Sequence, residues 1–258
     1  MKNYENVNMA FISFNSKRVY HNSEGSGELL LLLHGNVVSS LMFKQEIEFY
    51  KDFFHVIYFD YPGHGKSERL EKFSEDFWYY NARAAKAVLD EYDTNNIRVI
   101  GTSGGAVVGL NLAGIIPGKI SKMIVDSFFG LELAKSNAER IISKRTKAKK
   151  DYMTSSFWKY MHGEDWEEII NNDFDMTRRS VEHGRPAIKT DLTKIDFPVL
   201  ATASCKDELI DNIEERTLEV VNLIPGARTM IFDEGKHPFM ITMREKFREI
   251  AMNFLTSD

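Results

Sequence analysis

Residues 99–109 read VIGTSGGAVVG and place a serine between glycines at the junction of two apolar runs. A strand that passes into a helix through so tight a turn holds its middle residue in strained backbone space, and flanking glycines avoid clashes that a Cβ would create. The hydroxyl of Ser103 is therefore exposed. The helix that begins at Gly104 directs its free backbone N–H groups toward any negative charge that forms there. Such a turn is typical of a nucleophilic serine.

Outside this turn, strand patterns and helix patterns alternate along the chain. Continuous apolar runs predict buried strands, helical spacing of apolar residues predicts the helices between them, and repeated strand–helix–strand units indicate a parallel sheet with helices on both faces. A short antiparallel pair, 9–14 and 17–21, joined through Asn15 and Ser16, precedes this pattern. The predicted buried strands are 28–34, 54–60, 96–101, 121–128, 198–204 and 227–233, and the predicted helices are 39–53, 75–92, 105–116, 212–224 and one from about Pro238.

The predicted helix ends follow from local signals. A serine at the start of 39–53 and Ser74 before 75–92 are candidate helix caps. Pro117 stops the helix 105–116, because proline lacks the N–H that the next turn would need.

The alternation breaks between about residues 128 and 190. This segment reads as helical and strongly charged, with a basic stretch over 135–150 and an acidic one over 163–175. We interpret these charges as solvated helix faces, with a recognition surface as the alternative. The sequence therefore predicts an α/β core made of residues 1–127 and 191–258, with residues 128–190 inserted as a helical cap.

Composition excludes several classes of protein. A formal charge of −5 and a pI near 5.9 give no reason to expect a nucleic-acid partner. The longest apolar run, residues 29–33, is too short to span a membrane, and residues 1–11 lack the pattern of a signal peptide, so we expect a cytoplasmic protein. The single cysteine, Cys205, cannot form an internal disulfide and is expected to fill space in or near the core.

A serine hydroxyl needs a histidine to take its proton and a carboxylate to orient that histidine. Of the seven histidines, only His237 comes late in the chain, after the last predicted strand and before a helix. Asp207 follows a strand in a turn of polar residues that we expect to be exposed, and it is the favoured acid. Asp126, at the end of another strand, is the alternative.

The order Ser103, Asp207, His237, together with the motifs around it, resembles the α/β-hydrolase superfamily. The resemblance extends from about Leu29 to Phe254 and includes a His-Gly turn at 34–35 and the segment FDYPGHGKS, residues 59–67. It implies an α/β-hydrolase fold, with a mostly parallel eight-stranded sheet, helices on both faces and a helical cap. It also implies that the backbone N–H groups of Asn36 and Gly104 form the oxyanion hole. Within FDYPGHGKS, four residues are expected to hold the turn in shape: Asp60, Gly63, Gly65 and Ser67.

These residues predict a serine hydrolase that cleaves small or medium carboxylic esters through an acyl-enzyme, without a metal or organic cofactor. The same residues allow cleavage of a C–C bond in a dienoic acid, a thioester or an N-terminal peptide bond. A non-catalytic ligand receptor with this fold is a third hypothesis. A small ester-like molecule is the expected partner, and the sequence leaves the oligomeric state open. The candidate pocket walls, whose more ordinary role is core packing, are Phe128, Phe129, Trp158 and Phe239.

Overall fold

The computed structural model describes residues 10–92 and 95–257. Within them, eight strands form one sheet in the order β1-β2-β4-β3-β5-β6-β7-β8. The pairs β1–β2 and β2–β4 are antiparallel and the remaining pairs are parallel. The predicted fold class is confirmed. The strands are β1 (Ala10–Phe14), β2 (Lys17–Glu24), β3 (Leu29–Leu33), β4 (His55–Phe59), β5 (Ile97–Thr102), β6 (Ile120–Asp126), β7 (Val199–Ser204) and β8 (Arg228–Phe232).

The sheet begins with the predicted hairpin. Asn15 and Ser16 have φ angles of 50° and 62°, as a two-residue hairpin turn requires, and Phe14 pairs with Lys17 across it. Residues 1–9 lie outside the described residues, and with them the predicted start of the first strand and the stretch considered for a signal peptide.

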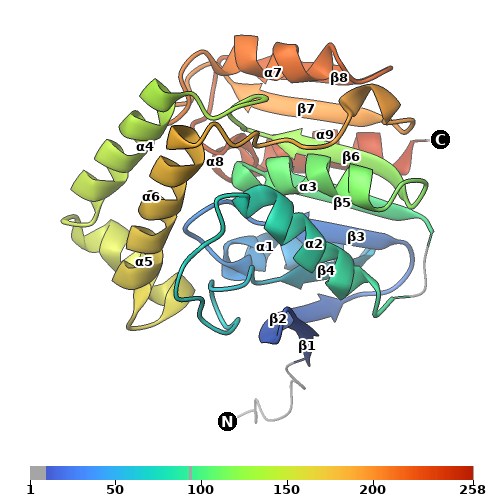
Figure 1. The fold of residues 1–258 in the computed structure, drawn as a ribbon. Coiled ribbons are helices and arrows are strands. Elements are labelled where there is room, and N and C mark those ends of the chain that lie inside the picture. The colour runs from blue at the N-terminus through green and yellow to red at the C-terminus, as the bar shows by residue number, and fades with distance from the viewer. Residues whose placement is uncertain (1–9, 93–94, 258) are drawn as a thin grey trace.

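Helices cover both faces of the sheet. They are α1 (Lys44–Tyr50), α2 (Phe77–Leu89), α3 (Gly104–Ile115), α4 (Lys135–Ala148), α5 (Tyr152–His162), α6 (Trp166–Glu182), α7 (Ile213–Val221), α8 (Phe239–Thr242) and α9 (Arg244–Thr256), with short 3-10 helices at Ser40–Phe43 and Leu192–Lys194. Of the two large core clusters, one contains residues of α2, α3 and α7, and the other contains residues of α1, α8 and α9. Figure 1 shows α2 and α3 in front of the strands and α9 behind them.

The five leucines of β3 explain why the core has two halves. Successive side chains of a strand point to opposite faces. Leu31 and Leu33 accordingly belong to the cluster under α2 and α3, whereas Leu30 and Leu32 belong to the cluster under α1 and α9. All four side chains are completely buried, which is why this strand reads as a continuous apolar run.

Helices α4, α5 and α6 follow one another between β6 and β7 and interrupt the alternation of strands and helices along the chain. Figure 1 shows them standing together beside one end of the sheet. No helix within residues 10–92 and 95–257 is long and apolar enough to cross a membrane.

Four local expectations were wrong. The serine at the start of 39–53, Ser39, precedes a 3-10 helix rather than α1, and its side chain makes no capping hydrogen bond. The N-cap residue of α2 is Asp76, and Ser74 instead accepts a hydrogen bond from the Asp76 backbone, because the chain makes one further turn before the helix starts. The closing helix is two helices, α8 and α9, that meet at Met243, whose φ and ψ of −123° and 47° are not helical. Cys205 is exposed, because the chain leaves the sheet at Ser204 and turns toward solvent.

Candidate active site

Ser103 stands at the sharp turn between β5 and α3. Its φ of 55° and ψ of −125° lie outside the regions that side chains favour, at a cost of roughly 1–3 kcal/mol. The surrounding structure holds the turn, because the Ser103 N–H donates to the carbonyl of Asp126 at 2.7 Å. Gly105 packs so closely on β3 that a Cβ there would collide with the carbonyl oxygen of Leu33. The flanking glycines are thus explained by close backbone packing around a half-buried serine.

The side chains of Ser103, His237 and Asp207 form one hydrogen-bonded chain. His237 Nδ1 lies 2.7 Å from Asp207 Oδ2, and His237 Nε2 lies 2.9 Å from Ser103 Oγ. An ionised carboxylate only accepts hydrogen bonds, so Nδ1 carries the proton and Nε2 is left to accept the serine hydroxyl. The two partners of the imidazole therefore fix the tautomer that a general base needs.

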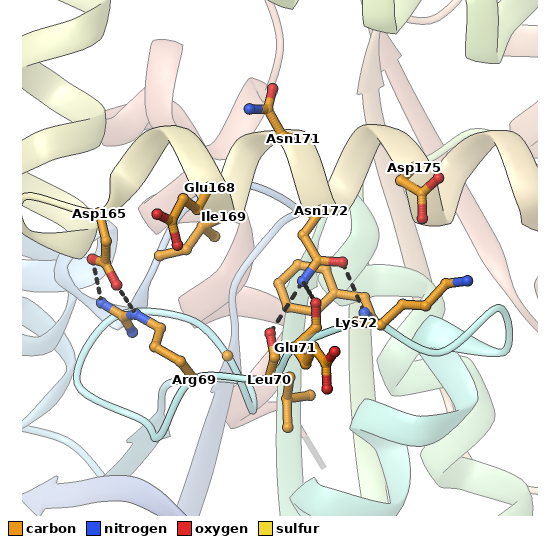
Figure 2. Close-up of a pocket in the computed structure, with 12 residues that line it drawn as sticks. Arg69, Leu70, Glu71, Lys72, Asp165, Glu168, Ile169, Asn171, Asn172 and Asp175 are labelled. Carbon is orange, nitrogen blue, oxygen red and sulfur yellow. Dashed lines mark hydrogen bonds and ion pairs between the residues drawn. The ribbon is translucent and has the colours of Figure 1, made fainter.

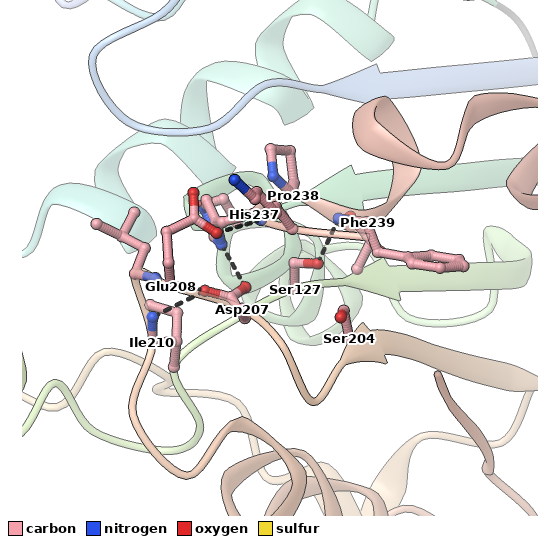
Figure 3. Close-up of polar contacts among 12 residues, drawn as sticks. Ser127, Ser204, Asp207, Glu208, Ile210, His237, Pro238 and Phe239 are labelled. Atoms are coloured by element: carbon pink, nitrogen blue, oxygen red, sulfur yellow. Dashed lines mark hydrogen bonds and ion pairs between the residues drawn. The ribbon is translucent and has the colours of Figure 1, made fainter. Parts of the chain in front are cut away.

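Asp207 lies in an exposed turn, as the sequence predicted, with Cys205 and Glu208 both exposed, but its own side chain points inward. Its side chain is completely buried, and that of His237 is 9% exposed. The backbone N–H groups of Leu209 and Ile210 hold the carboxylate there, because both donate to Asp207 Oδ1 at 2.8 Å. Figure 3 shows the Asp207 carboxylate between His237 and the turn that ends at Ile210.

Asp126, the alternative acid, lies at the end of β6 and is completely buried. Its carboxylate accepts hydrogen bonds from the hydroxyls of Thr102 and Thr202, both at 2.8 Å, and from the N–H of Met240 at 3.2 Å. Burial raises the pKa of Asp126 to about 6. Among the described residues, these three groups are its partners, and His237 is not one of them. Asp126 therefore joins the strands beneath Ser103 to the chain that follows His237.

Ser127, the residue directly after β6, also holds the chain after His237. Ser127 Oγ accepts a hydrogen bond from the backbone N–H of Phe239 at 2.8 Å (Figure 3). The backbone N–H of His237 itself donates to the carboxylate of Glu208 at 3.2 Å. The histidine is therefore held from both sides by groups other than its ring partners.

Asn36 belongs to the loop that follows β3, and its side chain is fixed at both ends. Asn36 Nδ2 donates to Asp173 of α6 at 2.7 Å, and Asn36 Oδ1 accepts from Trp78 Nε1 at 3.2 Å. A Cβ at Gly104 would collide with Asn36 Oδ1, so this loop lies directly against the start of α3. The two residues expected to form the oxyanion hole thus lie side by side, and both line the cavity that contains Ser103.

His34, at the start of the same loop, is completely buried. Its Nε2 accepts from the backbone N–H of Tyr61 at 3.1 Å, which leaves Nδ1 to donate to the Gly35 carbonyl at 2.8 Å. Burial lowers the pKa of His34 to about 3, so the ring stays neutral. His162 is at the end of α5, and its Nε2 lies 3.0 Å from the carbonyl oxygen of Val37. This contact ties the helical segment to the loop after β3. Neither histidine takes part in the Ser103 hydrogen-bonded chain.

The segment FDYPGHGKS forms the expected tight turn. Asp60 accepts hydrogen bonds from the N–H groups of Ser40 and Lys66, at 2.8 and 2.7 Å, and its carbonyl accepts from the Ser67 hydroxyl at 2.6 Å. A side chain at Gly63 or Gly65 would meet Phe73 or Asp60. None of these residues is among those lining the cavity around Ser103.

The cavity at Ser103 is small, with a volume of about 20 Å³. Of the four aromatic residues considered as pocket walls, Phe129 lines it. Phe128 and Phe239 are packed in the two core clusters, and Trp158 packs with Val37 in a third, smaller cluster. The lining residues are Asn36, Trp78, Ser103, Gly104, Phe129, Leu133, Ile141, Arg145, Thr177, Leu209 and Ile210.

Sequence reasoning missed Trp78, Thr177 and Arg145 in this cavity. A usable signal existed for Arg145, which lies three, four and seven residues after the buried Ile142, Ile141 and Ala138 and so continues the buried face of α4. The same spacing marks Trp78 and Thr177 as buried residues of α2 and α6, but it does not tell which buried side chain lies beside the site.

A larger cavity, of about 760 Å³, lies between residues 69–73 and α6. Figure 2 shows that its walls are tied together by Arg69 with Asp165 and by Asn172 with the backbone of the 69–73 segment. It shares no lining residue with the cavity at Ser103. Within the described residues, no group of three or more His, Cys, Asp or Glu side chains is arranged to hold a metal ion. We therefore place the candidate active site at Ser103.

Comparison with known proteins agrees with the fold. A family model described as the alpha/beta hydrolase fold matches residues 28–179. The chain is 25% identical to a 2-hydroxy-6-oxo-6-phenylhexa-2,4-dienoate hydrolase from Comamonas testosteroni, over 92% of this chain and 91% of that protein.

Solved structures show the same architecture. A meta-cleavage product hydrolase from Pseudomonas fluorescens IP01 superposes with a TM-score of 0.76 at 15% identity, covering 96% of this chain and 98% of the other. An esterase from Exiguobacterium antarcticum superposes with a TM-score of 0.72 at 22% identity, covering 96% of this chain and all of the other. Because the family model spans more than half of the sequence, the chain belongs to the family of proteins with the alpha/beta hydrolase fold.

Proposed function

We propose that this protein is a serine hydrolase that cleaves small or medium carboxylic esters in two steps through an acyl-enzyme. The observation that carries the proposal is the continuous hydrogen-bonded chain from Ser103 Oγ through His237 to the buried carboxylate of Asp207. Serine is a weak nucleophile at neutral pH, and this chain supplies the base and the orienting acid that it requires.

In the first step, Ser103 Oγ attacks the ester carbonyl while His237 Nε2 takes the hydroxyl proton. The backbone N–H groups of Asn36 and Gly104 receive the oxyanion of the tetrahedral intermediate, and donors of this kind typically contribute about 10²- to 10³-fold each. The intermediate collapses as the bond to the leaving oxygen breaks and His237 gives its proton to that oxygen. Asp207 stabilises the imidazolium throughout.

In the second step, His237 takes a proton from a water molecule, which attacks the acyl carbonyl. The new tetrahedral intermediate collapses, the bond to Ser103 Oγ breaks, and the serine regains its proton from His237. The carboxylic acid is released and the site returns to its starting state.

We also propose that residues 128–190 act as a cap over this site. Five of its residues line the cavity with Ser103: Phe129, Leu133, Ile141, Arg145 and Thr177. A volume of about 20 Å³ has room for little more than one water molecule, so an acyl group can enter only after the cap or the pocket side chains move. This motion would expose the serine to substrate and then shield the acyl-enzyme.

A C–C hydrolase is the second candidate function. The dienoate hydrolase from Comamonas testosteroni resembles this chain over nearly its whole length. The same hydroxyl and imidazole would then act at a carbonyl beside a C–C bond. Comparing the turnover of p-nitrophenyl butyrate with that of 2-hydroxy-6-oxo-6-phenylhexa-2,4-dienoate separates the two functions.

The test of the proposed chemistry is covalent labelling of the purified protein with a fluorophosphonate at neutral pH, followed by ester turnover. Ser103→Ala should abolish labelling and lower turnover by about 10⁴-fold or more. Ser143→Ala, which removes an exposed hydroxyl from α4, is the matched control and should change neither. A wild-type protein that is not labelled would favour a ligand receptor over an enzyme.

A further inference from the structure

The cavity at Ser103 contains a charged side chain that the proposed reaction does not use. Arg145 continues the buried face of α4, and its side chain is 14% exposed. Its neighbours in the cavity wall are mostly apolar, among them Phe129, Leu133 and Ile141. Among the described residues that line this cavity, Arg145 is the one with a charged side chain. A guanidinium in such surroundings would be a strong partner for a negative group on a ligand.

Arg145 has one hydrogen-bond partner among the described residues. Its Nη1 donates to Asp173 Oδ2 of α6 at 3.0 Å. A guanidinium carries five N–H donors, so most of those of Arg145 have no protein acceptor. Within the described residues, no side-chain nitrogen of Arg145 is both fully buried and unpaired. The donors without a protein acceptor are therefore accessible from the cavity or from solvent.

The carboxylate of Asp173 accepts hydrogen bonds from both Arg145 and Asn36. It is completely buried, and its second oxygen accepts the hydrogen bond from Asn36 Nδ2. Both carboxylate oxygens are therefore occupied, one by Arg145 and one by the loop beside Ser103. The carboxylate holds the guanidinium against the cavity and leaves the other donors of Arg145 for a second acceptor.

A purely structural ion pair explains this arrangement less well. Removing two charges from water is costly, and buried ion pairs are often no more stabilising than apolar residues of similar volume. Elsewhere on the same helix, Arg140 and Lys144 lie near the surface and contact the 207–211 segment. Only Arg145 of these three residues lines the cavity at Ser103.

We propose that Arg145 binds a carboxylate of the substrate, so that the natural substrates are acyl compounds carrying a free carboxylate close to the scissile carbonyl, such as half-esters of dicarboxylic acids. This inference rests on the proposed function of Ser103. The planar fork of a guanidinium matches a carboxylate through two parallel hydrogen bonds. Ser103 and Arg145 line the same cavity, so the scissile carbonyl and the carboxylate would belong to one small molecule and lie only a few bonds apart.

The experiment compares substrates that differ only in that charge. Monophenyl adipate is paired with phenyl methyl adipate, which places the carboxylate on the acyl side, and 4-acetoxybenzoate is paired with its methyl ester, which places it on the leaving group. Release of the phenol gives kcat/KM for each. We expect the wild-type protein to favour the carboxylate member of one pair by at least about tenfold, the range of a charge-assisted hydrogen bond.

Variants separate recognition by Arg145 from general effects. Arg145→Met leaves Asp173 buried without its partner and risks unfolding, so the decisive variant is the double substitution Arg145→Met with Asp173→Asn, which removes both charges. It should bring the preference for the carboxylate substrate close to unity. Lys147→Met removes an exposed cation from the same helix and should retain the wild-type preference.

A binding measurement keeps this inference apart from the proposed function. Calorimetry with adipate and 4-hydroxybenzoate on the Ser103→Ala protein reports carboxylate binding without turnover. If the wild-type protein is not labelled by the fluorophosphonate but the carboxylates still bind, and the double variant no longer binds them, the hydrolase is refuted and the carboxylate site is supported. Labelling and turnover with no preference in either wild-type pair, or a preference that persists in the double variant, would overturn the role of Arg145.

Discussion

The side chain of Asn36 donates a hydrogen bond to the completely buried carboxylate of Asp173, 137 positions later in the chain. This bond joins the loop after β3 to helix α6, and Asp173 in turn holds Arg145. The loop that we propose as half of the oxyanion hole is therefore braced by the same helical segment that we propose as the cap. If both proposals hold, substrate recognition and oxyanion stabilisation share the carboxylate of Asp173.

Asn36→Ala tests this brace, because it removes the side chain and keeps the backbone N–H. Asp173 then loses a donor, and we expect the free energy of unfolding to fall by roughly 1–3 kcal/mol. Because the loop is no longer held against α3, kcat for p-nitrophenyl acetate should fall by about tenfold. Asn22→Ala is the matched control, since Asn22 donates a similar bond to Tyr58 away from the site, and it should lower stability alone. An Asn36→Ala protein with unchanged kcat would show that the loop needs no brace.

The sequence was sufficient to predict the fold and the order of its main elements, because these depend on local patterns. The turn at 99–109 and the apolar run of β3 are examples, since each carries its own structural requirement. The wall of the cavity could not be predicted in the same way. Trp78, Arg145 and Leu209 come from three distant parts of the chain, and only the packed structure brings them together.

Arg145 shows why the interpretation of the charged segment was incomplete. We expected the basic residues of 135–150 to be solvated, and Lys147 and Lys150 are indeed exposed. Arg145 instead falls on the side of α4 that carries Ile141 and Ile142. A charged side chain at a buried position of the helical repeat is read correctly only from its spacing to Ile141 and Ile142, since charge by itself favours a solvated position.

Substitution by alanine is expected to have opposite effects on stability at two glycines of α3. Gly105→Ala places a methyl group against the carbonyl of Leu33, which belongs to the rigid β3, so we expect a loss of more than about 2 kcal/mol in the free energy of unfolding. Gly109→Ala meets only ordinary contacts, the nearest being Leu33 Cδ1 at 3.5 Å, and should stabilise the helix by about 0.5–1 kcal/mol. Chemical denaturation of both variants measures these differences. Equal changes in the free energy of unfolding for the two variants would contradict the close packing of Gly105 against β3.

The two candidate acids are separated by a matched pair of substitutions. Asp207→Asn replaces the carboxylate that His237 contacts at 2.7 Å and should lower kcat by about 10⁴-fold, because the amide favours the wrong tautomer. Asp126→Asn changes a carboxylate whose partners are Thr102, Thr202 and Met240, so kcat should stay within about tenfold of the wild-type value. Ester turnover at neutral pH measures both. A larger loss for Asp126→Asn than for Asp207→Asn would exchange their assigned roles.

Asp126 also predicts a pH-dependent contribution to stability. Burial raises the pKa of its carboxyl from 3.8 in an unfolded chain to about 6 in the folded protein. The folded state therefore takes up a proton as the pH falls through 6, while the unfolded state stays ionised until the pH approaches 3.8. The cost of burying the charge is fully present above pH 6, on the order of 3 kcal/mol, and it disappears as the pH falls toward 3.8.

Asp126→Asn removes this charge and keeps an oxygen to accept the bonds from Thr102 and Met240, while the new amide can donate to the Thr202 hydroxyl. The free energy of unfolding of the variant minus that of the wild-type protein should therefore be more positive at about pH 7.5 than at about pH 4.5. Urea denaturation of both proteins at a series of pH values gives this difference and cancels the titration of most other groups. A difference that does not change with pH would mean that Asp126 keeps an ordinary pKa in the folded protein, and one that grows as the pH falls would mean that its pKa is lowered.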